Sequence, residues 1–310
     1  MGMEKAHLTE EFFAPVATDP KGMESVARDP SIGWRAAWQR LKKNRGAVIS
    51  LAVLTVIILL AIFGPMMTPY DYAQTDYEES FKTPSGDHWF GTDKFGRDQW
   101  ARIWEGTRIS LYIALLAAAL DLVIGVMFGA ISAVCGGKVD MVMQRIIDIL
   151  VGIPHLIVVI LLILFMKPGI LTISVAMVIT GWVNMARLVR SQIFKLKAEE
   201  FVLASRALGA GFFRTIFKHY IPNTAGLILI NLMFTIPSAI FTEAFLSFIG
   251  LGLQEPLASL GVLINDGYHA MQSHYYLLFF PAVVIVALMI CFNLLADGLR
   301  DAIDPKMKNK

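Results

Sequence analysis

The sequence predicts an all-α polytopic membrane protein with six transmembrane helices. Of its 310 residues, 56% are hydrophobic and only 17% are charged, whereas about 25% of residues are charged in soluble domains. The apolar residues are gathered into blocks of roughly 20, the length that a helix needs to cross a hydrocarbon core of about 30 Å. A soluble fold could not expose this much apolar surface, so the blocks are expected to lie in a bilayer.

Six spans are predicted, at residues 46–67, 109–135, 146–166, 169–186, 223–248 and 275–296. The first, fourth and last contain no charged residue between their ends. The other three each contain one carboxylate, namely Asp121, Asp148 and Glu243, and these are expected to face the protein interior rather than lipid. Pro154 and Pro237 fall inside spans and predict kinks, because proline removes a backbone donor.

A glycine pair and the two cysteines are the remaining features of the spans. The second span contains the pair Gly125 and Gly129, which indicates either a close helix–helix contact or chance among 24 glycines. The two cysteines, Cys135 and Cys291, lie in or beside apolar blocks and have the spacing of neither a metal site nor a disulfide framework. No metal site is expected.

The distribution of basic residues predicts the orientation in the membrane. Six spans place both termini on the same side, and with that side cytoplasmic 21 of the 27 lysines and arginines lie inside. The other six lie in residues 68–108 or at Lys167. Because lysine and arginine concentrate in cytoplasmic loops, both termini are predicted to be cytoplasmic.

The polar segments complete the predicted organisation. Residues 1–45 form a cytoplasmic N-terminal tail, which lacks periodicity up to residue 33 and ends in a basic segment. Trp34 and Trp38 in that segment are four residues apart, so both indoles are expected at the headgroup level. An external loop at 68–108, a transmembrane core at 109–297 and a cytoplasmic tail at 298–310 follow the first span.

The loop between the fourth and fifth spans, residues 187–222, is predicted to form a helical hairpin. Ala198 to Leu208 consists mostly of good helix formers, and Gly209 then interrupts them. The apolar residues after the glycine occupy an arc of about 140° at helical spacing; they are Phe212, Phe213, Ile216, Phe217 and Tyr220. This helix is expected either to lie at the lipid surface or to dock against a partner.

The hairpin resembles the cytoplasmic coupling loop of ABC-importer permeases. In that family Glu-Ala-Ala stands six, five and four residues before a glycine, where this chain has Leu203, Ala204 and Ser205 before Gly209. The motif's glutamate is therefore absent, and Glu199 and Glu200 lie one turn earlier. The resemblance implies that the loop contacts ATPase subunits through Glu200, Leu203, Ala204, Ser205, Arg206, Gly209, Phe212, Phe213, Phe217, Tyr220 and Pro222.

Three further stretches resemble the C-type permease subunit of oligopeptide and dipeptide importers, in the type I ABC transmembrane domain family; they are residues 88–111, 243–261 and 292–305. In the first stretch, Gly91 and Gly96 allow tight turns, and Asp93, Arg97 and Asp98 can cross-brace the external loop. Three interpretations stay open for this motif: a structural loop, a substrate contact, or part of a platform on which a binding protein docks.

The resemblance implies a permease subunit, without catalytic residues of its own, that forms half of the translocation pathway of an ATP-driven peptide importer. The chain contains no GxxxxGK[ST] phosphate loop, so ATP and magnesium are expected on partner subunits. The implied partners are two ATPase subunits, a second homologous permease in a heterodimer, an extracytoplasmic peptide-binding protein and membrane lipid, but no nucleic acid. The implied location is the bacterial plasma (inner) membrane, with the chain crossing it several times.

Polar residues inside the spans are candidates to line the pathway, and each could equally hydrogen-bond between helices; they are Asn184, Asn231, Thr235, Ser238 and Glu243. The same architecture could import nickel or another small solute. An ion-driven secondary transporter is a further alternative, but it predicts related halves, and the sequence shows no internal repeat. An intramembrane enzyme would need a metal or nucleophile constellation, and His155 stands alone in its span.

Overall fold

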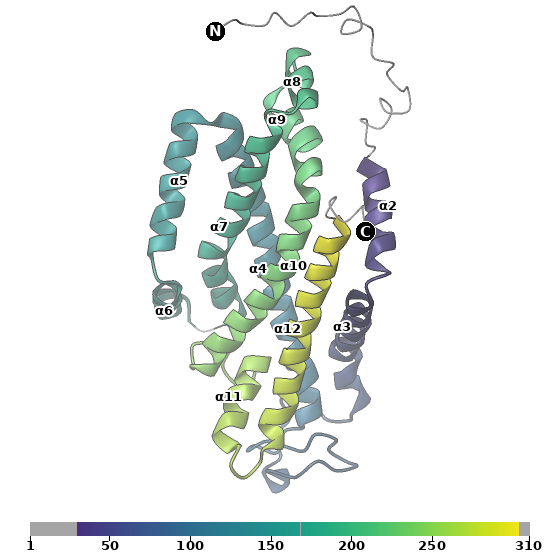
Figure 1. Cartoon of the computed structure of the whole chain (residues 1–310). Helices are drawn as coiled ribbons and strands as arrows, with labels where there is room; N and C mark the ends of the chain where they lie inside the picture. Colours follow the sequence, from purple (N-terminus) through teal and green to yellow (C-terminus); the bar gives the residue numbers. More distant parts are fainter. Residues whose placement is uncertain (1–29, 168, 304–310) are drawn as a thin grey trace, which may run out of the picture.

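The computed structural model describes residues 30–167 and 169–303, and these residues contain helices but no β-strand. Figure 1 shows the helices, which are α2 (Pro30–Leu41), α3 (Arg45–Phe63), α4 (Gln99–Cys135), α5 (Gly137–Gly152), α6 (His155–Met166), α7 (Ile170–Leu196), α8 (Glu200–Ala207), α9 (Phe212–Thr215), α10 (Ile221–Phe248), α11 (Leu260–Ala270) and α12 (Tyr276–Ile303). Short 3-10 turns follow at Gly64–Met67 and Tyr77–Glu79, and a π-helical segment at Ile216–Tyr220 joins α9 to α10.

Within residues 30–167 and 169–303, five helices are long and apolar enough to cross a membrane, and a bent helix pair makes a sixth span if it is counted as one. The predicted third span, 146–166, is not a single helix. It is divided between α5 and α6, whose axes are bent by 81°. The break falls at Ile153 and Pro154, where the sequence predicted a kink; proline disfavours helical backbone in the residue before it and cannot donate to the preceding turn.

Several helices continue beyond the apolar blocks that predicted the spans. α4 begins at Gln99, ten residues before the predicted start at 109, and α7 continues to Leu196, ten residues past 186. α12 continues to Ile303, so the first six residues of the predicted tail at 298–310 are helical. Pro237 lies inside α10, which runs through it as one helix.

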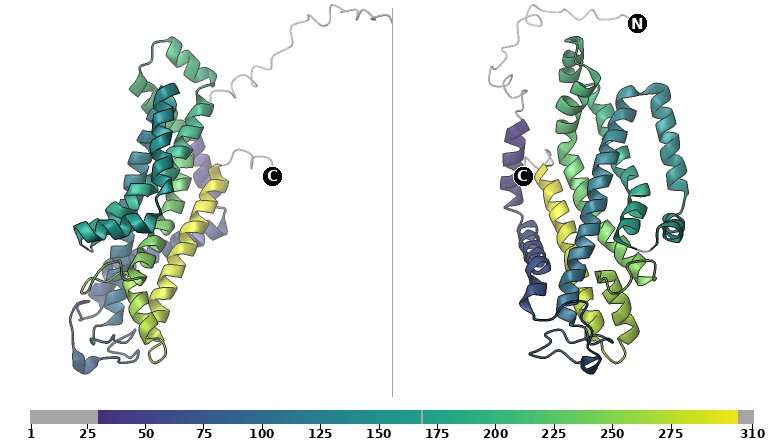
Figure 2. Two further views of the ribbon diagram at one scale, coloured as in Figure 1. Left: turned by 90° about the vertical axis from the view of Figure 1, so that its left-hand side faces the viewer. Right: turned by 180° about the vertical axis from the view of Figure 1, so that it is seen from behind.

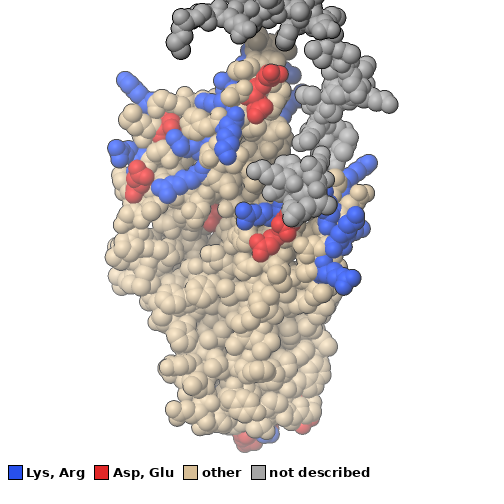
Figure 3. Space-filling view, viewed as in Figure 1, with Lys and Arg blue, Asp and Glu red and all other residues tan. Residues whose placement is uncertain are grey.

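The helices form a bundle in which α4 and α7 make the most extensive pair (Figures 1 and 2). α10 and α12 pack along α4 on one side, and α3 packs against both α12 and α4 at the edge. α5 and α6 contact α7 at the opposite edge. Charged side chains gather at the end of the molecule that carries α8, and a broad uncharged belt separates them from a few charges at the other end (Figure 3).

Gly125 and Gly129 lie on the face of α4 that packs against α7, so the pair marks a close helix contact. A Cβ added to Gly125 would lie 2.6 Å from Cβ of Met185, and one added to Gly129 would collide with the backbone carbonyl oxygen of Ala186. Small residues at such positions let two helix backbones approach, which provides packing where lipid gives little hydrophobic drive.

The N-terminal basic segment forms α2, which packs against the end of α12. Arg40 Nη1 donates to the carbonyl oxygen of Ala302 at 3.3 Å. The Trp38 side chain is half exposed, and that of Trp34 lies outside the described side chains. The predicted tail up to residue 29 and residues 304–310 lie outside the described part of the chain.

Candidate functional site

The α8–α10 hairpin, residues 198–222, reverses direction at a Schellman turn around Gly209. The Ala210 N–H donates to the Ser205 carbonyl at 3.1 Å, and the Gly209 N–H donates to the Arg206 carbonyl at 2.9 Å. Gly209 has φ +83°, in the left-handed region that residues with a Cβ atom rarely adopt. The glycine therefore sets the direction in which the chain leaves α8.

Three apolar side chains of the hairpin anchor it to the bundle. Val202, Ile216 and Tyr220 are fully buried and pack in one cluster with Val189 and Ile193 of α7. Burying such a side chain stabilises its position by about 1.5–3 kcal/mol. These three side chains consequently hold the hairpin against the last turns of α7.

Polar contacts also join the two arms of the hairpin. Ser205 Oγ lies 3.0 Å from His219 Nε2, and Arg206 Nη2 donates to Tyr220 Oη at 3.2 Å. At the start of the hairpin, Lys197 Nζ donates to the Val134 carbonyl at 3.3 Å. Burial and the neighbouring positive charge of Arg206 lower the pKa of the Lys197 ammonium.

The predicted aromatic arc divides into a buried and an exposed part. Ile216 and Tyr220 are buried, whereas the exposed fractions of Phe213 and Phe217 are 67% and 54%. The division coincides with the π-helical segment, which widens the turn just before Pro222, a residue with no N–H to donate. Tyr220 thus belongs to the anchor, and the phenylalanines belong to the outer surface.

Most of the predicted coupling residues are exposed on the two arms and the tip of the hairpin, which we call its rim. Leu208 at the tip has 89% of its surface exposed, and Leu203 has 52%. The exposed members of the predicted set are Glu200, Leu203, Ala204, Arg206, Gly209, Phe212, Phe213, Phe217 and Pro222, while Ser205 is half-buried and Tyr220 buried. We call the apolar part of this rim, Leu203, Leu208, Phe212, Phe213 and Phe217, the apolar rim.

At the opposite end of the bundle, the external loop is held by its charged motif. Asp93 accepts from the N–H groups of Phe95 and Arg97 at 2.8 and 3.0 Å, and from Arg97 Nε at 2.7 Å. Asp98 caps α4 by accepting from the Ala101 N–H at 2.9 Å, and it lies 2.8 Å from His88 Nδ1. These contacts are internal to the loop.

Gly91 and Gly96 both have positive φ, +76° and +73°, so both turns of the motif require glycine. A Cβ added to Gly91 would also lie 2.7 Å from the Tyr276 ring, and one added to Gly96 would collide with the Asp76 carbonyl. The motif is therefore packed tightly against its surroundings.

Charged residues tie the external loop to α11 and to the segment before it. Arg102 is fully buried, with Nε 3.4 Å from Asp93 Oδ2 and Nη2 4.0 Å from Asp266 Oδ2. Arg97 Nη2 donates to Glu255 Oε1 at 3.3 Å. Burial alone would lower the pKa of the Lys94 ammonium, but Asp266 and Glu255 outweigh it and raise that pKa. Distant parts of the chain thus form one external surface.

Tyr276 at the start of α12 fixes the same loop, and its removal gives a first prediction. Its hydroxyl lies 3.0 Å from the Lys82 carbonyl and 3.2 Å from the Thr92 carbonyl, and the residue is buried. Tyr276→Phe leaves these acceptors short of a donor, so we expect a loss of about 1–3 kcal/mol. Thermal unfolding in detergent measures it. Tyr275→Phe is the matched control, because Tyr275 is exposed, and equal stability of the two variants would contradict this role.

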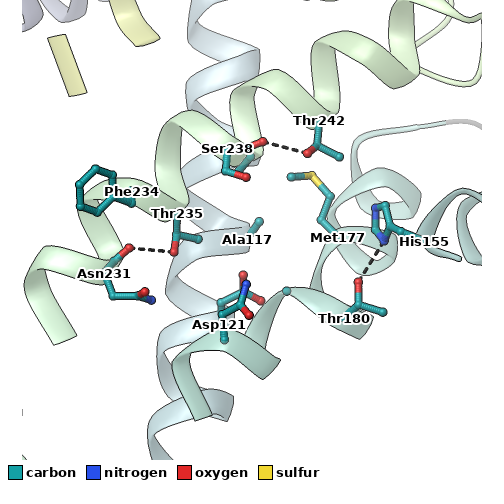
Figure 4. A pocket seen from close by; sticks show the side chains of 13 residues that line it. Ala117, Asp121, His155, Met177, Thr180, Asn231, Phe234, Thr235, Ser238 and Thr242 are labelled. Carbon is teal, nitrogen blue, oxygen red and sulfur yellow. Dashed lines mark hydrogen bonds between the residues drawn. The ribbon is translucent and has the colours of Figure 1, made fainter. Parts of the chain in front are cut away.

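A cavity of about 370 Å³ lies within the bundle between α4, α6, α7 and α10 (Figure 4). Four of the five predicted pathway residues line it, namely Asn184, Asn231, Thr235 and Ser238. Glu243 does not line this cavity. It is fully buried, where it accepts from Ser110 Oγ and Ser247 Oγ at 2.8 Å each, so it joins α4 to α10.

The cavity also contains residues that the sequence did not assign to it. Asp121, His155, Thr180 and Thr242 complete its polar wall. Asp121 was expected to face the interior, but nothing in the sequence placed it beside Asn184 or Asn231. Within the described residues, no group of three or more His, Cys, Asp or Glu side chains could hold a metal ion.

An ion pair near the hairpin is a second feature absent from the sequence prediction. Arg190 of α7 makes two hydrogen bonds to the carboxylate of Asp140 in α5, each 2.6 Å. Asp140 also accepts from Ser132 Oγ at 2.5 Å. Bidentate pairs of this kind fix geometry as well as charge, so the turn between α4 and α5 is held to α7.

Comparisons with known proteins fit this arrangement. The sequence model of the binding-protein-dependent transport system inner membrane components matches residues 125–309, and that of the N-terminal transmembrane domain of oligopeptide transport permease C matches residues 34–84. Among solved structures, the inward-facing MetNI methionine ABC transporter is similar with a TM-score of 0.54 and 19% identity, covering 65% of this chain and 96% of that one. At this identity the likeness shows the fold alone.

Curated relatives cover almost the whole chain. The oligopeptide transport system permease protein OppC of Bacillus subtilis (strain 168) is 47% identical over 97% of this chain and 99% of its own length. The dipeptide transport system permease protein DppC of the same organism is 46% identical, covering 96% and 94%. OppC of Escherichia coli (strain K12) is 42% identical, covering 88% and 91%. The chain therefore belongs to the family of binding-protein-dependent transport system inner membrane components, in its OppC and DppC branch of ABC-importer permeases.

Proposed function

We propose that this chain is one permease subunit of an ATP-driven peptide importer, and that the α8–α10 hairpin couples it to separate ATPase subunits. The peptide cargo is supported by the names of the relatives, which are oligopeptide and dipeptide permeases. A second, homologous permease completes the pathway, and an extracytoplasmic binding protein delivers the cargo. ATP and magnesium are bound by the ATPases.

One observation carries the coupling role: both arms of the hairpin are joined to helices that line the cavity, the first arm through a short turn at 197–199 and the second without a break. α7 contributes Thr180 and Asn184 before it ends at Leu196, where the hairpin begins. The other arm continues without a break from Phe212 to Phe248 and contributes Asn231 and Thr235. A displacement of the hairpin must therefore move two walls of the cavity.

The proposed mechanism uses this rigid connection. ATP binding draws the two ATPases together and pulls the hairpins of the two permeases with them, which opens the pathway outward to receive peptide. Hydrolysis resets it. The coupling free energy comes from contacts that differ between the two states, and the exposed apolar rim supplies a surface for such contacts.

The orientation follows from the charge distribution. We infer that the hairpin, α2 and the end of α12 face the cytoplasm, because basic residues gather at that end of the molecule (Figure 3). The external loop with Asp93 and Arg97 then lies on the outer side, where its internal contacts support a structural role and its surface offers a platform for the binding protein.

Co-isolation in mild detergent tests the coupling role. The tagged chain, expressed with its partners, is expected to bring down two ATPases. Phe213→Ser combined with Phe217→Ser should reduce this recovery at least about tenfold, because each buried ring contributes about 1.5–3 kcal/mol to an interface. Tyr77→Ser is the control, an exposed aromatic residue in the external loop. Full ATPase recovery with the double variant would contradict the docking surface.

Uptake assays test the cargo. Cells that lack this subunit and regain it are expected to take up labelled peptides of graded length. If nickel uptake returned while peptide uptake did not, the cargo assignment would be wrong and the permease assignment would stand.

A further inference from the structure

The cavity between α4, α6, α7 and α10 has an unusual charge balance. Among its lining residues, all in the described part of the chain, Asp121 is the one acidic side chain and none is lysine or arginine. Among the other lining residues only His155 is titratable, and its Nδ1 lies 3.0 Å from Thr180 Oγ1. A single carboxylate therefore dominates the electrostatics of the cavity.

No lysine or arginine of the described residues lines the cavity beside Asp121. Its side chain is 95% buried, since its exposed fraction is 5%, and Oδ1 has no hydrogen-bond partner among the described residues. An unpartnered buried carboxylate is costly, and groups of this kind in membrane proteins mark sites of function. The carboxylate is therefore free to accept hydrogen bonds from a molecule outside the described residues.

The local packing keeps space for this carboxylate. Gly181 of α7 faces it, and a Cβ added to Gly181 would lie 2.7 Å from Asp121 Oδ1 and collide with Oδ2. α4 and α7 therefore approach closely beside Asp121, which sits where the two helices meet the cavity (Figure 4).

Two hydroxyl groups of the cavity wall already donate their protons to backbone carbonyl groups. Thr235 Oγ1 donates to the Asn231 carbonyl at 3.0 Å, and Thr242 Oγ1 donates to the Ser238 carbonyl at 2.8 Å. With their protons used, these oxygens can only accept from a molecule in the cavity. The cavity wall therefore offers these two hydroxyl oxygens as acceptors in addition to the Asp121 carboxylate, and the amides of Asn184 and Asn231 can accept as well as donate. A ligand rich in N–H donors thus finds several acceptors.

We propose that Asp121 is a binding site for an alkylammonium group of the transported molecule. This site rests on the proposed peptide import, because a peptide carries such a group at its amino terminus or on a lysine side chain. The ammonium has three donors and no acceptor, which matches a carboxylate in a cavity whose wall also presents hydroxyl oxygens. The cavity volume of about 370 Å³ lies within the range of small-ligand pockets.

The test measures equilibrium binding to the complete complex, with its second permease and ATPases, in lipid nanodiscs without the binding protein. Labelled trialanine is competed with unlabelled trialanine, N-acetyl-trialanine and N-acetyl-Ala-Lys-Ala. The first and third peptides carry an ammonium group and the second does not, so the arms separate a terminal source from a side-chain source. The variants are Asp121→Asn, which is isosteric but uncharged, and Met177→Leu, a conservative change of an apolar residue in the same cavity wall.

In the wild type, we expect ammonium-bearing peptides to compete about ten- to a hundredfold better than N-acetyl-trialanine, the range for a hydrogen-bonded charge. Asp121→Asn should abolish this preference, whereas Met177→Leu should keep it. Equal competition by all peptides in the wild type, or an unchanged preference in Asp121→Asn, would overturn the ammonium site. If a cationic side chain of the second permease pairs with Asp121, all peptides should compete equally in the wild type.

Two further measurements distinguish a failure of the Asp121 site from a failure of the proposed peptide import. Recovery of the Asp121→Asn complex with its ATPases shows that the variant folds, and Gly181→Ala provides a second variant that displaces the carboxylate while keeping its charge. Gly181→Ala should weaken the ammonium preference as well, and a preference retained in full would count against the site. If no peptide binds or enters cells at all, peptide import fails; binding without ammonium dependence overturns the Asp121 site alone.

Discussion

Gly209→Val is expected to abolish uptake while the chain still inserts in the membrane. Gly209 has φ +83°, and a residue with a side chain pays about 1–2 kcal/mol in this region, more when it is β-branched. The Schellman bonds from Ala210 to Ser205 and from Gly209 to Arg206 would be lost with the turn. The most exposed part of the apolar rim, Leu208, would then be displaced from the ATPases.

The expected effect is large because the turn, and not its surroundings, sets the geometry. No atom lies within 4 Å of a Cβ added to Gly209, so the variant does not disturb packing. Uptake is expected to fall at least about tenfold, because a cost of about 1.4 kcal/mol in the docked geometry is already a factor of ten. ATP hydrolysis should lose its dependence on the binding protein.

Gly211→Val is the matched control for this experiment. Gly211 lies two residues away in the same hairpin, also has open space around its Cβ, and has φ −70°, which any residue adopts. The comparison isolates the backbone conformation of Gly209. Normal uptake by Gly209→Val, or an equal loss in both variants, would remove the turn from the coupling mechanism.

Gly129→Leu is expected to prevent stable folding. The close approach of α4 and α7 leaves no space at this position, since an added Cβ would collide with the backbone carbonyl of Ala186. A backbone atom cannot move aside as a flexible side chain can, so the two helices must separate. Overpacking of this kind costs about 1–3 kcal/mol or more, and here it acts on the central helix pair.

The amount of chain in membranes and its unfolding temperature in detergent measure this effect. Gly152→Leu serves as the control, because a Cβ at Gly152 meets nothing within 4 Å. Wild-type stability of Gly129→Leu would show that α4 and α7 do not depend on this contact. We expect Gly125→Leu to behave like Gly129→Leu, since its Cβ would lie 2.8 Å from the Trp182 carbonyl oxygen.

The sequence predicted the bundle well where long apolar blocks coincide with helices. α4 begins ten residues before the span predicted from 109, because the helix also includes Arg102, Glu105 and Arg108, which interrupt the apolar pattern. Arg102 is nevertheless buried, in reach of Asp93 and Asp266, which are distant in sequence. Hydropathy cannot anticipate such partners, because pairing depends on where the external loop and α11 meet.

The candidate site was predicted in part for a similar reason. Gly209 and the exposed phenylalanines follow from local pattern, but helical periodicity assigned Tyr220 to the same arc as Phe213 and missed the π-helical turn between them. Glu243 and Asp121 are both intramembrane carboxylates in the sequence. Only the packing separates them, since Glu243 is hydrogen-bonded by Ser110 and Ser247 and Asp121 faces the cavity.

The most direct measurement is ATP-driven peptide uptake by purified components in proteoliposomes. Vesicles that contain this chain, the second permease and both ATPases are expected to accumulate peptide delivered by the binding protein, and only with ATP. Vesicles that contain the two permeases without the ATPases should accumulate none. Uphill accumulation in those ATPase-free vesicles would contradict the account.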